Sequence, residues 1–334
     1  MTPPASGELS QFERMDLGRE DACDSLVQLL KKTDARAVVH LAFVIDPVRN
    51  GVLDTDRMWQ INVAGTARVM EAITESNRRG GTVRKFVFPS SVAVYGTDYP
   101  KPAAEELRLT GHSLLYAIHK RESDEVVQRR AEQLGHCASY ILRPPIFVGP
   151  SIDNYMIGVL RGTPSGRGRL ARRWRAQGKR LPILLPYGDR YLRQLLQFIH
   201  IDDMARLIAW TLRQPERDHL PKTTVLNVAG RGEALTVAEA IDIAQARVKR
   251  LPTRGMCRRA LRVLWNLGLS GVPPEALPYM LGPCTMDVSR LQCLLGHGYQ
   301  QVIRFTMREA LADSFAAELA GTPSEPHEAE ISEN

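Results

Sequence analysis

The chain has 334 residues, of which 44% are hydrophobic and 24% are charged, and its formal net charge at pH 7 is +7. A chain of this length and composition can bury a large core, which argues against an intrinsically disordered protein. Its five cysteines are widely spaced, without a Cys-x-x-Cys pair or a histidine cluster, which argues against both a disulfide framework and a metal site. We therefore expect no bound metal and a cytoplasmic location.

The N-terminal residues, MTPPASGELSQFERMD, are polar and include acids, unlike a signal peptide or a membrane anchor. No later stretch offers the roughly 20 apolar residues that a membrane-spanning helix needs. The sequence thus predicts no membrane span.

Two clusters hold the excess positive charge, one between Arg161 and Arg180 and the other between Lys249 and Arg262. Such runs are most often solvated loops or helix faces. The alternatives are a phosphate-bearing substrate and peripheral contact with an anionic membrane surface. No recognised nucleic-acid-binding motif accompanies the charge, so we expect no nucleic-acid partner.

Apolar runs alternate with helical patterns in the first half of the chain. Helical spacing at residues 26–30 precedes a β-branched run at 37–43, and a second helical pattern covers 54–79. Further strands are expected at 85–88 and 138–142, on either side of a helix at 114–135. Strands that alternate with long helices predict an α/β fold with a mainly parallel, doubly wound sheet.

The alternation loosens after Gly149 into sequence rich in glycine, proline and arginine, up to about residue 193. We interpret this segment as part of a substrate-binding region over 151–319. The chain is expected to return to the core at about 197–230, through a helix and a strand. Residues 1–150 form the predicted core. The acidic segment 320–334 has nothing to bury, which predicts a disordered tail.

The most informative pattern is Ser91, at the end of an apolar run, 25 positions ahead of Tyr116, with Lys120 four residues further on. Transfer of a hydride at a carbinol or ketone needs a group that exchanges the proton of the oxygen. A tyrosine can do so when a cation lowers its pKa, and a lysine four residues along a helix lies on the same face. A hydroxyl that closes a parallel strand would lie at the edge of the sheet where ligands bind.

In this context the sequence resembles the extended short-chain dehydrogenase/reductase family, also called the NAD-dependent epimerase/dehydratase family. The resemblance covers about Phe12 to Gly296. Its most specific element is Phe88-Pro-Ser-Ser-Val-Ala-Val-Tyr-Gly96, and the other matching segments are Met15-Asp16-Leu17, Val38-Val-His-Leu-Ala42, Asn62-Val-Ala-Gly-Thr66, Leu142-Arg143-Pro144-Pro145 and His200-Ile-Asp-Asp203.

The resemblance implies a Rossmann-type fold, NAD or NADP as cofactor, and catalysis by Ser91, Tyr116 and Lys120. It also implies a cofactor site, a small-molecule substrate, and pairing of two copies through the helices at 54–79 and 113–135. Alternatively, Asn62 ties down backbone groups and Asp203 caps the helix that follows it. Tyr95 is interpreted as a packing residue. The implied cofactor-binding residues are Asp16, Leu17, Leu41, Ala42, Asn62, Ser90, Tyr116, Lys120 and Pro145.

Members of that family open with a strand and a Gly-x-x-Gly-x-x-Gly turn that binds the pyrophosphate. Here Gly7, Gly18 and Gly51 do not form that pattern, and the resemblance begins at what corresponds to a third strand. The strand at 38–43 should then lie at an unpaired, apolar edge of the sheet. Three explanations are a mis-assigned start codon, which we favour, a fragment completed by a partner chain, and a member that has lost catalysis.

Nucleotide-sugar epimerases of the family carry an arginine shortly before the His-x-x-Asp element, where this chain has Leu195-Leu196-Gln197. Arg190 and Arg193 lie slightly upstream and are candidates to bind substrate in its place, together with Ser91 and Tyr116. Three functions therefore stay open: an epimerase or dehydratase acting on a secondary alcohol or ketone of a nucleotide sugar, a ketone reductase of the steroid or flavonoid type, and a non-catalytic binding or scaffold protein.

Overall fold

The computed structural model describes residues 12–45, 54–97, 99, 102–215, 222–282 and 284–319. The predicted acidic tail at 320–334 lies outside the described residues, as do Gly7 and Gly51. The chain divides into two compact units, one made of residues 1–90, 118–141 and 216–224, and the other of 91–117, 142–215 and 225–334. The predicted division at about residue 150 stays a prediction.

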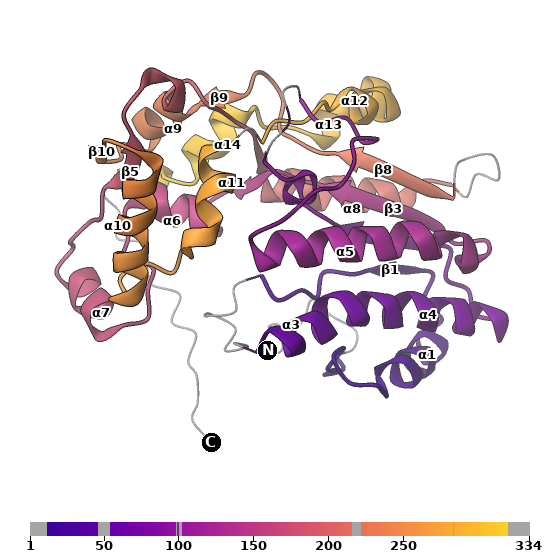
Figure 1. Cartoon of the computed structure of the whole chain (residues 1–334). Helices are drawn as coiled ribbons and strands as arrows, with labels where there is room; N and C mark the ends of the chain where they lie inside the picture. The colour runs from indigo at the N-terminus through magenta and orange to yellow at the C-terminus, as the bar shows by residue number, and fades with distance from the viewer. Residues whose placement is uncertain are drawn as a thin grey trace. The chain divides into compact units, whose positions relative to one another are not determined.

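The first unit carries the alternation of helices and strands that the sequence predicts (Figure 1). Helix α1 packs along α4, and the two run side by side in Figure 1. The face of α1 that holds Val27 and Leu30 is buried, which accounts for the spacing of its leucines. The elements that begin in this part of the chain are α1 (Ala22–Lys32), β1 (Ala37–Val39), α3 (Thr55–Trp59), η1 (Gln60–Ala64), α4 (Gly65–Arg78), β2 (Lys85–Pro89), η3 (Ala131–Leu134) and β3 (Ala138–Arg143).

A four-stranded sheet has the strand order β1-β2-β3-β8, where β8 is Thr223–Asn227. Strands β1 and β2 are parallel, with Val38 opposite Phe86. All of β2 except Pro89 is buried, as expected for a strand covered on both faces. Within the described residues β1 stands at one end of the order, and Leu41 just beyond it is 66% exposed. Among the described strands β1 therefore has β2 as its single neighbour, and the unpaired edge expected for 38–43 stays a prediction.

The helix predicted at 54–79 begins and ends within one residue of that range but contains an irregular turn. Asp54 caps its start by accepting a hydrogen bond from the backbone N–H of Asp56 at 2.9 Å. Residues 60–64 then form one turn of π-helix before α4. Such turns often mark functional sites, and this one carries Asn62.

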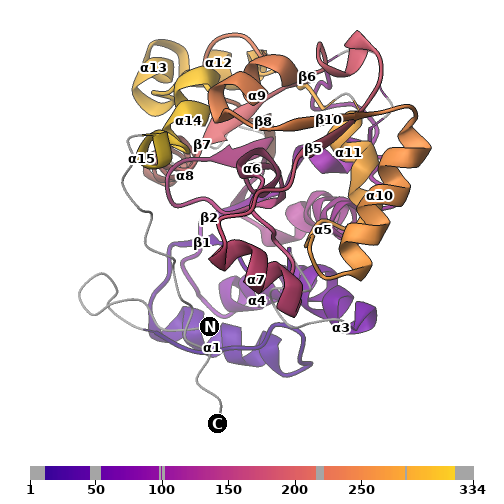
Figure 2. The same ribbon diagram turned by 90° about the vertical axis from the view of Figure 1, so that its left-hand side faces the viewer.

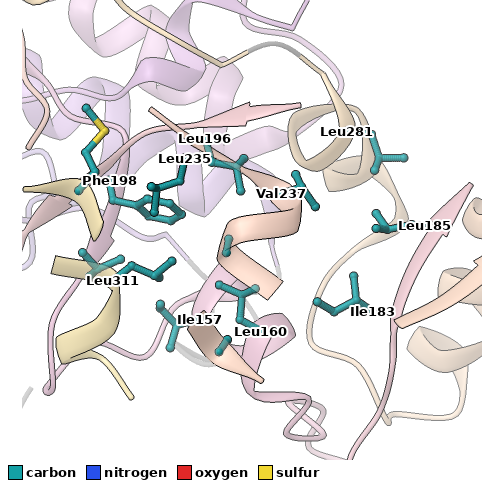
Figure 3. Packing of buried hydrophobic residues seen from close by; sticks show 14 of the residues in the cluster. Ile157, Leu160, Ile183, Leu185, Leu196, Phe198, Leu235, Val237, Leu281 and Leu311 are labelled. Atoms are coloured by element: carbon teal, nitrogen blue, oxygen red, sulfur yellow. The ribbon is translucent and has the colours of Figure 1, made fainter. Parts of the chain in front are cut away.

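The second unit contains a large apolar core. The core includes Leu160, Leu196, Phe198 and Val237, and Figure 3 shows these side chains gathered between the elements of this unit. Its elements are η2 (Val92–Tyr95), β4 (Ile146–Val148), α6 (Tyr155–Arg161), α7 (Arg169–Ala176), β5 (Ile183–Pro186), η4 (Asp189–Tyr191), β6 (Leu195–Leu196), β7 (Phe198–His200), α8 (Ile201–Arg213), β9 (Leu235–Thr236), α9 (Val237–Ala244), β10 (Val248–Leu251), α10 (Arg254–Asn266), η5 (Pro274–Ala276), α11 (Leu277–Leu281), α12 (Ser289–Leu295), η6 (Gly296–Gly298), α13 (Tyr299–Val302), α14 (Met307–Asp313) and α15 (Ala316–Leu319).

Three two-stranded pairings accompany this core. Strand β4 pairs with β7 and β5 pairs with β10, both in parallel, while β6 and β9 are antiparallel. The segment that the sequence left as irregular, up to residue 193, thus holds helices α6 and α7, strand β5 and the short helix η4. Among the described residues, no helix combines the length and apolarity that crossing a bilayer requires.

Candidate active site

Ser91 and Tyr116 are brought together in the second unit. Ser91 precedes η2 with extended backbone, and its Oγ accepts a hydrogen bond from the N–H of Ala93 at 3.2 Å. Tyr116 lies in the first turn of α5 (Leu115–Arg130), and its hydroxyl is hydrogen-bonded to the side chain of Ser91. Burial raises the pKa of Tyr116, and the hydrogen bond from Ser91 opposes that rise.

Lys120 lies one helical turn after Tyr116 on α5, and its side chain is buried. Its Nζ donates a hydrogen bond to the carbonyl oxygen of Pro89 at 2.8 Å and lies 3.8 Å from the centre of the Phe43 ring. Burial lowers the pKa of Lys120 to about 7, and the charge of Asp124 opposes this. The Phe88 ring also lies near Nζ, with its centre 5.0 Å away.

A buried carboxylate that the sequence analysis did not single out supports this part of the site. Asp124 accepts hydrogen bonds from Ser90 Oγ at 2.6 Å and from Gln128 Nε2 at 2.7 Å. It stands four residues after Lys120, so the same helix face carries both groups. The signal for Asp124 in the sequence was its spacing of four residues from Lys120. Such a spacing is typical of an ordinary surface ion pair, and the sequence did not show that both side chains are buried.

Asn62 fixes the segment that follows β1. Its Oδ1 accepts a hydrogen bond from the N–H of Val44 at 2.6 Å, and its Nδ2 donates to the carbonyl of Val44 at 3.1 Å. The same Nδ2 lies 3.3 Å from Nδ1 of His119. Asn62 therefore has the backbone-tying role that the sequence allowed, and its direct contact with a cofactor stays a prediction.

We expect Asn62→Ala to lower the free energy of unfolding by about 2 kcal/mol, because both backbone groups of Val44 lose their partner in a buried place. Asn77 offers a matched control, since it makes the same two bonds with Val83 at 2.8 and 3.1 Å but is only partly buried. Asn77→Ala should cost about half as much. Urea unfolding of both variants measures the difference, and equal losses would contradict the role of burial.

Asp16 and Leu17 are held by arginines of the following helices. Asp16 Oδ1 accepts a hydrogen bond from the N–H of Gly18 at 3.0 Å, and its other oxygen pairs with Arg57. The carbonyl of Leu17 accepts from Arg68 Nη1 at 3.0 Å. The carboxylate of Asp16 is thus already paired with Arg57, and its approach to a cofactor stays a prediction.

The other predicted cofactor-binding positions flank strand ends. Leu41 is exposed and Ala42 is half-buried in the segment after β1. Pro145 is buried between β3 and β4, and the carbonyl of the preceding Pro144 accepts a hydrogen bond from the N–H of Val92 at 2.8 Å. This contact places the segment that ends in Pro145 beside the residue that follows Ser91.

Arg190 and Arg193 are exposed. Arg190 Nη2 donates to the hydroxyl of Tyr191 at 2.8 Å, and Arg193 pairs with Asp189 at 3.6 Å. Neither of these contacts involves Ser91 or Tyr116, so substrate binding by the two arginines stays a prediction.

Gln197 occupies the stretch where nucleotide-sugar epimerases of the family carry an arginine. Its Nε2 donates to the carbonyl of Met286 at 3.0 Å, and its Oε1 accepts from the N–H of the same residue at 2.8 Å. The neighbouring Leu196 belongs to the apolar core. Gln197 therefore holds the backbone of Met286 and Leu196 packs in the apolar core, so neither position supplies a cation.

Asp203 does not cap helix α8, because the cap is His200, whose Nδ1 accepts from the N–H of Asp202 at 3.1 Å. The buried carboxylate of Asp203 instead accepts from the N–H groups of Arg304 and Phe305 at 2.8 and 3.0 Å. The capping role that the sequence allowed is thus wrong. Asp203 fixes a loop about one hundred residues further along the chain.

Tyr95 is a buried packing residue with a bonded hydroxyl, as the sequence predicted. The hydroxyl donates to Asn227 Oδ1 at 2.7 Å and accepts from Arg143 Nη1 at 2.7 Å. The backbone N–H of Asn227 in turn donates to Glu105 Oε1 at 3.0 Å. Sequence spacing gave no sign of this network, because Asn227 lies more than one hundred residues after both Tyr95 and Glu105.

An apolar pocket of about 100 Å³ lies elsewhere in the second unit. It is lined by residues of α6, β5, α9, α10 and α11, among them Leu160, Leu185, Ile241, Cys257 and Leu261, and none of the predicted site residues borders it. Among the described residues, no three His, Cys, Asp or Glu side chains are grouped closely enough to hold a metal ion.

Comparison with known proteins decides the family. The pattern of the NAD dependent epimerase/dehydratase family matches residues 2–229. The chain belongs to this family, and the relatives that it matches are enzymes. A UDP-glucose 4-epimerase from Streptomyces lividans is 28% identical to it over 210 residues, which are 61% of this chain and 58% of that protein. The match thus spans little more than half the length of the curated relative.

Solved structures of such enzymes share the fold. MoeE5 in complex with UDP-glucuronic acid and NAD aligns with a TM-score of 0.61 and 22% identity, over 96% of this chain and 89% of the other. UDP-glucose 4-epimerase from Thermus thermophilus in complex with NAD gives 0.59 and 18%, over 91% and 84%. The predicted Rossmann-type α/β fold is confirmed.

The described residues fit one end of a nicotinamide dinucleotide. The side chain of Lys120 is a hydrogen-bond donor of the kind that the hydroxyls of a nicotinamide ribose need, and the hydroxyls of Ser91 and Tyr116 are of the kind that a reacting oxygen needs; their contact with a cofactor or substrate stays a prediction. The pyrophosphate end is different, because the described residues include no glycine-rich turn between a strand and a helix. The fit is therefore to the nicotinamide half.

Proposed function

We propose that this family member is an oxidoreductase that uses NAD or NADP to act on a secondary alcohol or ketone of a nucleotide sugar. The observation that carries the proposal is the hydrogen bond between Tyr116 and Ser91, followed one helical turn later by the buried ammonium of Lys120. The sequence relative from Streptomyces lividans, a UDP-glucose 4-epimerase, supports the substrate class.

A bound nicotinamide would supply the acceptor for the hydride that leaves the carbinol carbon. Tyr116 takes the proton that leaves the carbinol oxygen, and Ser91 donates a hydrogen bond to that oxygen as the carbonyl forms. Return of the hydride and the proton restores an alcohol. Lys120 orients the cofactor ribose, and the hydrogen bond from Ser91 opposes the rise in the pKa of Tyr116 that burial causes.

A ketone reductase of the steroid or flavonoid type is the second candidate. The observation that favours it is the use of Gln197 for backbone bonds in the stretch where sugar-nucleotide enzymes of the family place an arginine. A steroid or flavonoid has no diphosphate and needs no such cation. Competition by UDP for turnover separates the candidates, because UDP should inhibit the sugar-nucleotide enzyme and leave the ketone reductase unaffected.

Cofactor binding tests both enzymatic proposals. We expect isothermal titration calorimetry to show NAD or NADP binding, with the affinity reduced at least about tenfold in Lys120→Met because the ribose hydroxyls lose a charged donor. The titration is run on the chain of 334 residues and on the longest form that its reading frame encodes. Absence of binding by both forms would favour the scaffold protein and contradict the enzyme.

A further inference from the structure

The excess of positive over negative charge lies in two segments of the second unit. Residues 154–188 and 243–274 contain fifteen lysines and arginines and no aspartate or glutamate. The remaining 29 basic and 37 acidic residues leave the rest of the chain with a formal net charge of −8. The molecule is therefore strongly polarised, with one basic region on an otherwise acidic chain.

These two segments pack against each other. The N–H of Gly166 donates to the carbonyl of Leu269 at 3.1 Å, and that of Gly168 donates to the carbonyl of Gly268 at 3.2 Å. The backbones approach so closely that a Cβ on Gly166 would lie 2.0 Å from the carbonyl oxygen of Gly268. The start of α7 is thus fixed against the end of α10, and Figure 2 shows both helices on the side of the second unit that faces the viewer.

Helix α10 exposes an apolar stripe. Met256, Val263 and Leu267 are 42%, 56% and 52% exposed, and their spacing of seven and four residues puts them on one face of the helix. Leu170 on α7 is also exposed. The inner face of α10, with Cys257 and Leu261, lines the apolar pocket, so burial there does not account for the outer stripe.

Arginines surround this stripe without carboxylate partners. Six arginines of α7 and α10 are considered, namely Arg169, Arg172, Arg173, Arg258, Arg259 and Arg262. Among the described residues, none of them lies within ion-pair distance of an acid. All six are exposed. Their mutual repulsion is relieved only by counterions or by an anionic partner.

We propose that the surface formed by α7 and the outer face of α10, called here the α7–α10 face, docks on an anionic lipid bilayer. Clustered arginines attract acidic headgroups, at about 1 kcal/mol for each cation near the surface. The apolar stripe decides between lipid and nucleic acid. Met256, Val263 and Leu267 gain free energy by entering the boundary between headgroups and acyl chains, whereas a phosphate backbone offers them nothing.

Co-sedimentation with vesicles tests the proposal on the full chain. Phosphatidylcholine vesicles with about 30% phosphatidylglycerol should bind the protein at physiological salt, at least about tenfold more strongly than phosphatidylcholine alone. Changing Met256, Val263 and Leu267 together to serine should weaken binding at least about tenfold. Leu195→Ser, at an exposed apolar site on β6, is the control and should have no effect.

A charge comparison separates a specific face from general attraction. Changing Arg258, Arg259 and Arg262 to glutamine removes the same charge as changing Arg78, Arg79 and Arg129, which lie in the first unit. Only the first set should weaken vesicle binding more than about tenfold. Equal losses, or absence of binding to the acidic vesicles, would overturn the proposal.

Two further readouts keep the result clear. A blue shift in the fluorescence of Val263→Trp on addition of acidic vesicles, relative to the native protein, supports insertion even where the triple serine variant folds poorly. Binding to duplex DNA that matches vesicle binding in strength, and that the serine changes leave intact, would reassign the face to nucleic acid.

Discussion

Tyr116→Phe should lower kcat for substrate turnover by at least about a hundredfold, since positioned proton transfer contributes that much or more. The ring remains, so packing at the start of α5 is kept, and the affinity for the cofactor should change less than about threefold. The measurement is steady-state turnover of the form that binds NAD or NADP by calorimetry, with unfolding followed in parallel.

Tyr99→Phe is the matched control for this change. The Tyr99 hydroxyl is buried and has no hydrogen-bond partner in the described part of the chain, so its removal should leave kcat unchanged and keep or slightly raise stability. Turnover of Tyr116→Phe at the native rate would remove the phenol from the mechanism. Ser91 would then need another proton carrier.

Regular elements of the first unit were accessible to sequence reasoning because their patterns are local. The apolar run at 85–88 became a buried strand, and the run at 138–142 gained only Arg143. The strand at 37–43 is shorter than its apolar pattern, since only Ala37–Val39 pair with β2. After His40 the chain runs to Val44, whose backbone N–H donates to Asn62 in the π-helical turn. The spacing of the residues does not predict that turn.

Contacts between distant segments explain what sequence reasoning missed. Asp203 reads as a helix cap by position, yet its partners are Arg304 and Phe305, and nothing near residue 203 indicates them. Likewise α7 was left as irregular sequence, because its start depends on backbone contact between Gly168 and Gly268. The pattern of Tyr116 and Lys120 could be recognised in the sequence because the two residues are close together, one helical turn apart.

Lys120→Met should make the protein more stable and less active. The ordinary lysine pKa of 10.5 falls to about 7 in the folded chain because burial disfavours the ammonium form. Holding a charge there costs free energy, so removing it should raise the free energy of unfolding at pH 7, by up to about 4 kcal/mol. Cofactor affinity and turnover should fall, since the ribose loses its donor. Higher stability together with lower activity is the result expected when a cation serves function at the expense of stability.

The pH dependence of stability distinguishes this account from simple repacking. Between pH 7 and 10.5 the unfolded chain binds a proton at Lys120 that the folded chain does not, so native stability should rise with pH in that window. The advantage of Lys120→Met is then largest at pH 7 and below, and shrinks as the pH approaches 10. Urea unfolding at pH 6, 8 and 9.5 measures it. Lys32→Met, at an exposed lysine of α1, is the control, and its free energy of unfolding should stay within about 0.5 kcal/mol of that of the native protein at each pH. A gain in stability of Lys120→Met that is the same at all three pH values would mean that better packing, and not removal of the charge, stabilises the fold.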